Sequence, residues 1–210
     1  MTRATTTAVI SLVLAGASQA AITTTGGDAV LSPAPASTLL GAIESNTIAR
    51  AFNEVSSFTL ATNLPVNATT PGVYSSNGSL TPGVIAAGTV VNSHYLYVDP
   101  VGDGPAMYEG FVEFDQPILG VIVLRNGLNS SDFLGAPGTT YGDNVARGME
   151  LSGNEAFTIT LSQFRVNFRF NTTTATDDIR IITAVPAPGA AAMIGLAATA
   201  CLRRRRNLRG

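Results

Sequence analysis

Apolar and polar residues alternate in several short segments of this chain, as they do in strands with one buried face. In one such segment, Val166, Phe168 and Phe170 share a face. The residues between them, Asn167 and Arg169, share the opposite face. The pattern predicts a strand that packs against a core on one side and meets solvent on the other.

A second region carries two different strand signals in succession. Val112 and Phe114 alternate with Glu113 and Asp115, which predicts another half-buried strand. The run that follows at 118–124, ILGVIVL, is apolar at nearly every position. Because this run lacks alternation, it predicts a central strand covered on both faces.

Segments with these patterns recur and predict about eight strands. They are residues 55–61, 84–92, 94–99, 107–116, 119–125, 156–162, 165–170 and 178–183. Turn sequences separate them, namely Asp103-Gly104-Pro105, Asn126-Gly127 and Ala136-Pro137-Gly138. The sequence therefore predicts an all-β fold, specifically an antiparallel β-sandwich with jelly-roll or Greek-key wiring.

The two ends of the chain depart from this pattern and divide it into four parts. Residues 1–20 predict a signal peptide, and 52–184 the β-sandwich domain. Between them, residues 21–51 are rich in Thr, Ala, Pro and Gly and predict a flexible or partly helical lead. Residues 185–210 predict a sorting tail with a transmembrane segment.

The N-terminal segment has the order of parts found in secretory signal peptides. Arg3 precedes an apolar stretch at 8–17, AVISLVLAGA, and small residues follow at Ser18 and Ala20. This order predicts cleavage between Ala20 and Ala21 by signal peptidase. The alternative is an N-terminal membrane anchor, which requires about 20 apolar residues in a helix, about twice the length of this stretch.

The C-terminal tail also combines three parts in fixed order. The first part is Val185, Pro186, Ala187, Pro188 and Gly189, whose prolines end the last strand and leave an extended segment. An apolar run over 190–202 enters the bilayer. The stop-transfer residues, which stay on the cytoplasmic side, are Arg203, Arg204, Arg205 and Arg206. The alternative is a permanent tail anchor, but residues 185–202 number only 18 and include two prolines.

This tail resembles the PEP-CTERM sorting signal of Gram-negative bacteria, which an exosortase recognises and cleaves. Ala187 stands where that family usually has glutamate. Residues 94–185 are also similar to a domain of other PEP-CTERM proteins, with a strand like FVEFDQPILGVI at 111–122 and a closing strand like DDIRIIT at 177–183. The resemblance implies export through the inner membrane, a cut near Pro188, and a final place at the cell surface or outside the cell.

The region between the two ends is acidic. All 14 acidic residues lie between Asp28 and Arg180 with only six of the 12 arginines, so this segment has a net charge of −8. Such a surface repels phosphate backbones, which argues against nucleic acid as a partner. The one cysteine, Cys201, lies in the apolar tail. The domain therefore contains no cysteine that could form a disulfide or bind a metal as a thiolate.

Three acidic residues are candidates for catalysis. Glu109, Glu113 and Asp115 share one face of a predicted strand, where alternate residues lie about 7 Å apart, a separation that overlaps glycosidase carboxylate pairs. A solvated polar face is the favoured interpretation, because catalytic carboxylates normally face each other across a cleft. The single histidine, His94, is a candidate general base, but a structural hydrogen bond at a strand end is favoured for it.

Ligand binding has candidate residues as well. Oxygen ligands for Ca²⁺ occur at Asp99, Asp103 and Glu109, and again where Asp177 stands beside Asp178. The spacing matches no EF-hand, and turn geometry is the favoured explanation for the first group. A sugar-stacking platform has four candidate residues, which are Tyr95, Tyr97, Tyr108 and Tyr141.

Together these features favour an exported, non-catalytic protein of the cell surface or extracellular matrix, without a resident cofactor. Its expected partners are signal peptidase, an exosortase-type membrane protease and, transiently, the bacterial inner membrane. Two alternatives stay open. One is a secreted module that binds extracellular polysaccharide or Ca²⁺, and the other is a secreted hydrolase that uses Glu113 and Asp115.

Overall fold

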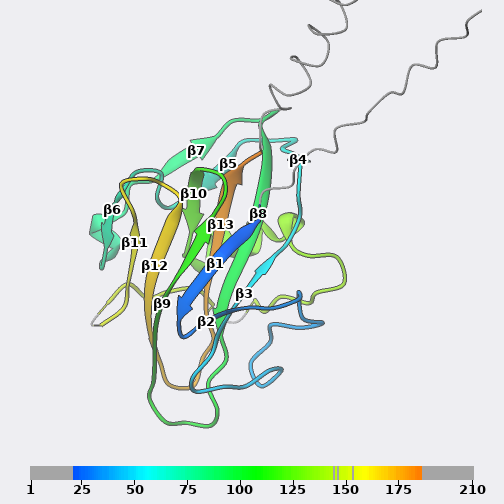
Figure 1. Cartoon of the computed structure of the whole chain (residues 1–210). Coiled ribbons are helices and arrows are strands. Elements are labelled where there is room, and N and C mark those ends of the chain that lie inside the picture. Colours follow the sequence, from blue (N-terminus) through cyan, green and yellow to red (C-terminus); the bar gives the residue numbers. More distant parts are fainter. Residues whose placement is uncertain (1–20, 144, 146, 153, 186–210) are drawn as a thin grey trace, which may run out of the picture. The chain divides into compact units, whose positions relative to one another are not determined.

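Two antiparallel β-sheets pack against each other across a shared hydrophobic core (Figure 1). The structure is a computed structural model, and it describes residues 21–185 except 144, 146 and 153. Within these residues the chain forms 13 strands, one short α-helix and two 3-10 turns. The expectation of a β fold built from antiparallel sheets is confirmed.

The strands fall into two large sheets and one small ribbon. Sheet A has the order β1 (Ile22–Gly27), β9 (Ala106–Phe114), β12 (Arg165–Thr172), β11 (Ala156–Ile159) and β6 (Gly72–Tyr74). Sheet B has the order β10 (Ile118–Ile122), β13 (Asp177–Ala184), β8 (Val90–Val98), β3 (Ala49–Asn53) and β2 (Ala29–Leu31), with β4 (Phe58–Thr59) also on β8. The ribbon is formed by β5 (Leu64–Val66) and β7 (Gly83–Ile85). Every pair is antiparallel except β2 with β3.

The main core lies between the two sheets. Val112 and Phe168 enter it from sheet A, and Leu96 and Ile181 from sheet B. The opposite face of sheet A is half-exposed, so strands such as β12 alternate between buried and partly exposed residues, as predicted. Alternation fails in β8 and β13, which are buried at nearly every position.

Sheet B is buried on both faces because a second apolar layer covers its outer face. Tyr95 and Ile182 point into this layer. The cover includes Leu128 from α1 (Arg125–Ser130) and Leu134 from the 3-10 turn η2 (Asp132–Leu134). Polar residues that point outward from sheet B therefore lie in the protein interior, and this places one of the two clusters described below.

Two local expectations require correction. The run at 118–124 is buried, as expected, but its strand β10 is at the edge of sheet B rather than at the centre. A short bridge from Ala68 to Val121 borders its outer side. Asn126-Gly127 lies in α1 and not in a turn. Because Gly127 has no side chain, the helix can approach Ile122 closely.

The expectation of a flexible or partly helical lead over residues 21–51 is wrong. β1 pairs with β9 along most of its length, and β2 and the start of β3 belong to sheet B. In addition, the side chain of Asn53 accepts a hydrogen bond from Ile22 N at 3.2 Å. The domain predicted for residues 52–184 therefore begins about thirty residues earlier, at β1.

In the part of the chain that the structure describes, no helix combines the length and apolar character needed to cross a membrane. The predicted signal peptide, the apolar run at 190–202 and the arginines that follow it lie outside the described residues.

Candidate functional site

The described residues that border the predicted processing sites meet at one turn. Ala21 N donates a hydrogen bond to Asp115 Oδ1 at 3.0 Å, and Ala184 N donates to the carbonyl of Pro117 at 2.9 Å. Asp115 and Pro117 belong to the turn between β9 and β10. Val185 follows β13 directly, whereas the other predicted processing residues, in 1–20 and 186–210, are outside the described part.

The candidate catalytic carboxylates of β9 lie on the half-exposed face of sheet A. Glu113 forms an ion pair with Arg165 at 2.9 Å, and Glu109 lies 4.0 Å from Arg169. Asp115, beyond the end of the strand, holds the backbone of Ala21. These contacts fit the solvated polar face that the sequence favoured.

The first set of candidate calcium ligands does not come together. Both carboxylate oxygens of Asp99 accept backbone hydrogen bonds, from Gly41 N and Ile43 N, each at 2.9 Å. Asp99 therefore anchors the loop before β3. Asp103 and Glu109 are exposed.

In the second set of candidate calcium ligands, Asp177 lies among other acidic residues but Asp178 does not. Asp177 and Asp178 are neighbours in β13, so their side chains point to opposite faces of sheet B. Asp178 lies on the outer face, where Thr176 Oγ1 donates to it at 3.4 Å. Burial raises the pKa of Asp178 to about 6, against the opposing effect of Arg147. Asp177 instead lies on the inner face.

Asp177 belongs to a group that we name the carboxylate cluster: Glu150, Glu155 and Asp177. Among the described residues, this is the acidic group whose oxygens all lie within 4.8 Å of one another. Glu155 and Asp177 are buried, and Glu150 is exposed. None of the ion pairs among the described residues involves any of the three.

The electrostatics of the carboxylate cluster are unfavourable when all its members are ionised. Burial raises the pKa of Asp177 to about 10, and the charges of Glu155, Glu150 and Asp178 act in the same direction. Burial also raises the pKa of Glu155, helped by the charge of Glu150. Asp177 and Glu155 lie close enough to share a proton. With both ionised, neither can donate, and Asp177 Oδ2 has no partner among the described residues.

A second and largely buried polar group, on the outer face of sheet B, was not anticipated from the sequence. We name it the arginine cluster: Glu54, Asp132, Arg147 and Arg180. Arg180 is fully buried and donates to both carboxylate oxygens of Glu54, each at 2.8 Å. Its remaining nitrogen donates to the Leu128 carbonyl at 3.0 Å and to Ser131 Oγ at 2.7 Å.

Arg147 completes the arginine cluster from the loop before β11. It donates to both oxygens of Asp132, at 2.7 and 2.8 Å, and to Tyr95 Oη at 3.0 Å. Arg180 also reaches Asp132, at 3.1 Å. Two buried cations are thus paired by forked hydrogen bonds with one buried anion, Glu54, and one partly exposed anion, Asp132. The sequence signal that could have revealed this cluster is Arg180 itself, placed between Ile179 and Ile181 in β13.

His94 is a buried residue in the middle of β8 rather than at a strand end. Its Nδ1 lies 2.7 Å from Asn53 Oδ1, and its Nε2 lies 3.0 Å from Thr183 Oγ1. Burial lowers its pKa to about 3, so the ring is neutral at physiological pH. The favoured structural role fits these contacts, because both ring nitrogens are used within the protein.

The four tyrosines do not form a platform for sugar stacking. Tyr95, Tyr97 and Tyr108 are fully buried, so their rings are inaccessible to a ligand. Tyr141 is half-buried against Tyr95, with the ring centroids 5.0 Å apart. That candidate surface is therefore excluded.

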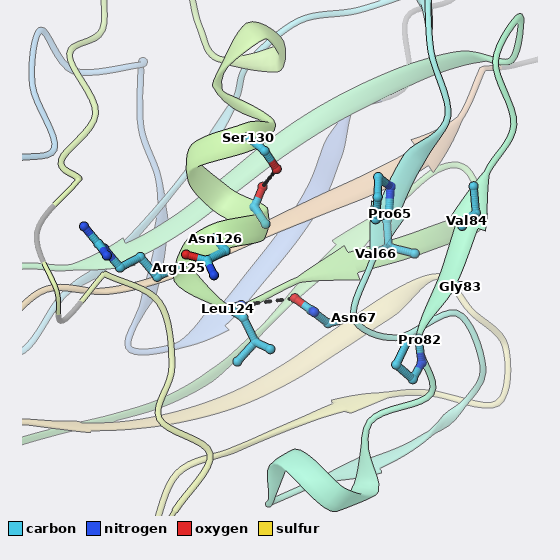
Figure 2. A pocket seen from close by; sticks show the side chains of 11 residues that line it. Pro65, Val66, Asn67, Pro82, Gly83, Val84, Leu124, Arg125, Asn126 and Ser130 are labelled. Atoms are coloured by element: carbon cyan, nitrogen blue, oxygen red, sulfur yellow. Dashed lines mark hydrogen bonds between the residues drawn. The ribbon is translucent and has the colours of Figure 1, made fainter.

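One open groove lies between the β5–β7 ribbon and the start of α1 (Figure 2). Its volume is about 790 Å³. Pro65 and Val84 line the ribbon side, and Arg125 and Asn126 the helix side. Asn67 joins the two sides, because its side-chain oxygen accepts a hydrogen bond from Leu124 N at 3.1 Å. The groove has no aromatic ring among its lining residues and no carboxylate.

Comparison of the chain with protein-family models, with curated proteins and with solved structures gave no match.

Proposed function

We propose that this chain is an exported, non-catalytic protein of the cell surface or extracellular matrix, processed through a PEP-CTERM type of sorting signal. The observation that carries the proposal is the order of parts in the tail. A Pro-Ala-Pro motif at 186–188 is followed by the apolar run at 190–202 and by four consecutive arginines. This order holds a chain in the membrane and presents an extended segment to a protease.

The boundaries of the folded region support two processing cuts. β1 begins at Ile22 and β13 ends at Ala184, so cuts after Ala20 and near Pro188 leave all described strands intact. Both ends of the folded region are hydrogen-bonded to the turn at 115–117.

The proposed fold is an antiparallel β-sandwich with jelly-roll or Greek-key wiring. The chain passes repeatedly between the two packed sheets, from β8 to β9 and on to β10, which supports this wiring. The contacts of the candidate catalytic groups support a non-catalytic role. Glu113, Asp115 and His94 each hold another part of the domain.

The test is the intact mass of the protein recovered from cells and from medium. We expect a mature chain that starts at Ala21 and ends near Pro188. A chain that starts at Ala21 but retains Arg203 to Arg206 would contradict the sorting proposal and indicate a permanent tail anchor. A chain that still begins at Met1 would contradict export by signal peptidase.

A matched variant separates the two cuts. Replacing both Pro186 and Pro188 with alanine is expected to block the second cut while the first still occurs, because the prolines present only the C-terminal segment. As a control, Pro137→Ala changes a proline in an internal loop and should leave both cuts unchanged. Normal processing of the double variant would remove the motif from the proposal.

A further inference from the structure

We propose that the carboxylate cluster, Glu150, Glu155 and Asp177, binds a calcium ion. The proposal is independent of the export route, because it rests on the described domain alone. Two members of the cluster come from the loop before β11, and the third is the first residue of β13. The ion would therefore fasten that loop to sheet B.

The spacing of the ligand atoms suits a calcium ion. The three oxygens lie at most 4.8 Å apart. Geometry then guarantees a point no more than about 2.8 Å from all three, and a small adjustment gives the calcium–oxygen distance of about 2.3–2.6 Å. The exposed Glu150 leaves the site open to solvent, which can supply the remaining ligands as water.

Asp177 provides an independent indication that a ligand is missing from this site. The residue is 1% exposed, and its Oδ2 has no hydrogen-bond partner among the described residues. Buried oxygens of this kind are rare, because a lost hydrogen bond in the interior costs about 1–3 kcal/mol. A cation within the cluster satisfies the oxygen directly.

The carboxylate of Glu155 is already held in position. One of its oxygens accepts a hydrogen bond from Glu150 N at 3.0 Å, and the other accepts one from Asn171 N at 3.4 Å. Each oxygen keeps a further lone pair. Backbone donors of this kind orient a ligand before the ion binds, which lowers the ordering cost of binding.

The chemistry of the donor atoms favours calcium over other metals. All three side chains offer carboxylate oxygen, the ligand preferred by hard cations, and the cluster has neither histidine nor cysteine. Calcium accepts irregular geometry and a variable number of waters, whereas magnesium requires near-octahedral ligands at about 2.1 Å. A site with two buried ligands and one exposed ligand on a loop fits calcium better.

The competing arrangement is a proton shared between Asp177 and Glu155, with no metal. The two arrangements are distinguished by melting the purified protein in EGTA and then in excess CaCl₂ or MgCl₂. With calcium at about a hundredfold above its dissociation constant, we expect the melting temperature to rise by about 5–10 °C. Magnesium should produce a smaller rise.

Variants assign the effect to the cluster. Asp177→Asn and Glu155→Gln should abolish the calcium-dependent rise, and Glu150→Gln should weaken calcium binding about tenfold or more in a calorimetric titration. Because Glu150 is exposed, the last variant keeps the test valid if a buried replacement fails to fold. The control Glu113→Gln removes an acid from β9 and should retain the full rise.

Two results would overturn the proposal. The first is a wild-type protein whose melting temperature is the same in EGTA and in calcium, which indicates the shared proton. The second is an equal calcium-dependent rise in wild type, Asp177→Asn and Glu150→Gln, which indicates adventitious binding to the acidic surface.

Discussion

The two faces of sheet B carry buried polar groups that satisfy their charges in opposite ways. On the outer face, Arg180 and Arg147 are each matched by a carboxylate through paired hydrogen bonds. On the inner face, Glu155 and Asp177 are buried beside Glu150 without a described cation. The outer cluster is complete in the protein itself, whereas the inner cluster requires a proton or a metal ion.

Burial alone therefore does not show whether a polar group only stabilises the fold or also binds a ligand. Both clusters are formed by residues distant in sequence, and both lie beside apolar cores. Only the count of charges and donors separates them. Removing one partner from the complete cluster should strongly destabilise the folded protein. The incomplete cluster should instead respond to a proton or a metal ion taken up from solution.

The largest effect is expected from the outer cluster. Glu54→Gln keeps the shape of the side chain but removes the charge that faces Arg180, leaving a fully buried guanidinium underpaired. We expect the free energy of unfolding to fall by about 3 kcal/mol, measured by urea denaturation. The control Glu113→Gln breaks the half-exposed pair with Arg165 and should cost less than about 1 kcal/mol. Equal losses in the two variants would contradict the account of the outer cluster.

His94 extends the comparison to a buried group that is neutral. Its contacts are Asn53, Thr183 and the ring of Phe114, none of which is charged. The pKa is lowered to about 3 in the folded protein, so between about pH 6.5 and 3 the unfolded chain binds a proton that the folded one does not. Stability from this residue is therefore lost as pH falls, by about 1.4 kcal/mol per unit.

The measurement for His94 is urea unfolding of wild type and His94→Gln at pH 7 and pH 5. Between these two conditions the wild type should lose about 2 kcal/mol more than the variant. Groups that titrate elsewhere affect both proteins alike and cancel in the difference. An identical pH dependence in the two proteins would show that His94 is protonated in the folded state.

The inner cluster should respond to the same chemical change with the opposite sign. In EGTA, Asp177→Asn removes a carboxyl group that must bind a proton when the chain folds, because its pKa is raised to about 10, and we expect the free energy of unfolding to rise by about 1 kcal/mol. Glu54→Gln is the matched comparison, because both variants convert a buried carboxylate to an amide. A loss of more than about 2 kcal/mol for Asp177→Asn would mean that its carboxylate has an essential partner within the protein.

The smallest effect concerns a contact that processing would strengthen. A cut after Ala20 converts Ala21 N into an ammonium group beside Asp115 Oδ1, 3.0 Å away. Asp115→Asn should therefore destabilise a chain that begins at Ala21 by about 1 kcal/mol more than a chain with one additional residue before it. Thermal unfolding of the four proteins checks this. No difference between the two chain lengths would contradict the pairing.

The fold could be predicted from sequence where strands have a buried face. The alternation around Val166 and Phe168 located β12, and the apolar run at 118–124 located β10. β1 escaped prediction because it buries only Ile22, and its Thr and Gly residues give no apolar pattern. The extended conformation of β1 is held by its pairing with β9, a segment distant in sequence.

The candidate site could be predicted only in part, for the same reason. The sequence indicated Asp177 as a ligand but paired it with its neighbour Asp178, which a strand directs to the other face. Glu150 and Glu155 come from a segment without a strand or turn signal, and they reach Asp177 only because β11, β12 and β13 bring the loops together. No local sequence pattern predicts that these three residues come together.

The most direct measurement of the difference between the two faces is a crystal structure of the protein grown in calcium chloride. We predict an ion about 2.3–2.6 Å from carboxylate oxygens of Glu150, Glu155 and Asp177, with the outer cluster unchanged. Oxygens of Asp177 and Glu155 about 2.5–2.7 Å apart, with no ion between them, would show a shared proton instead and contradict the calcium site.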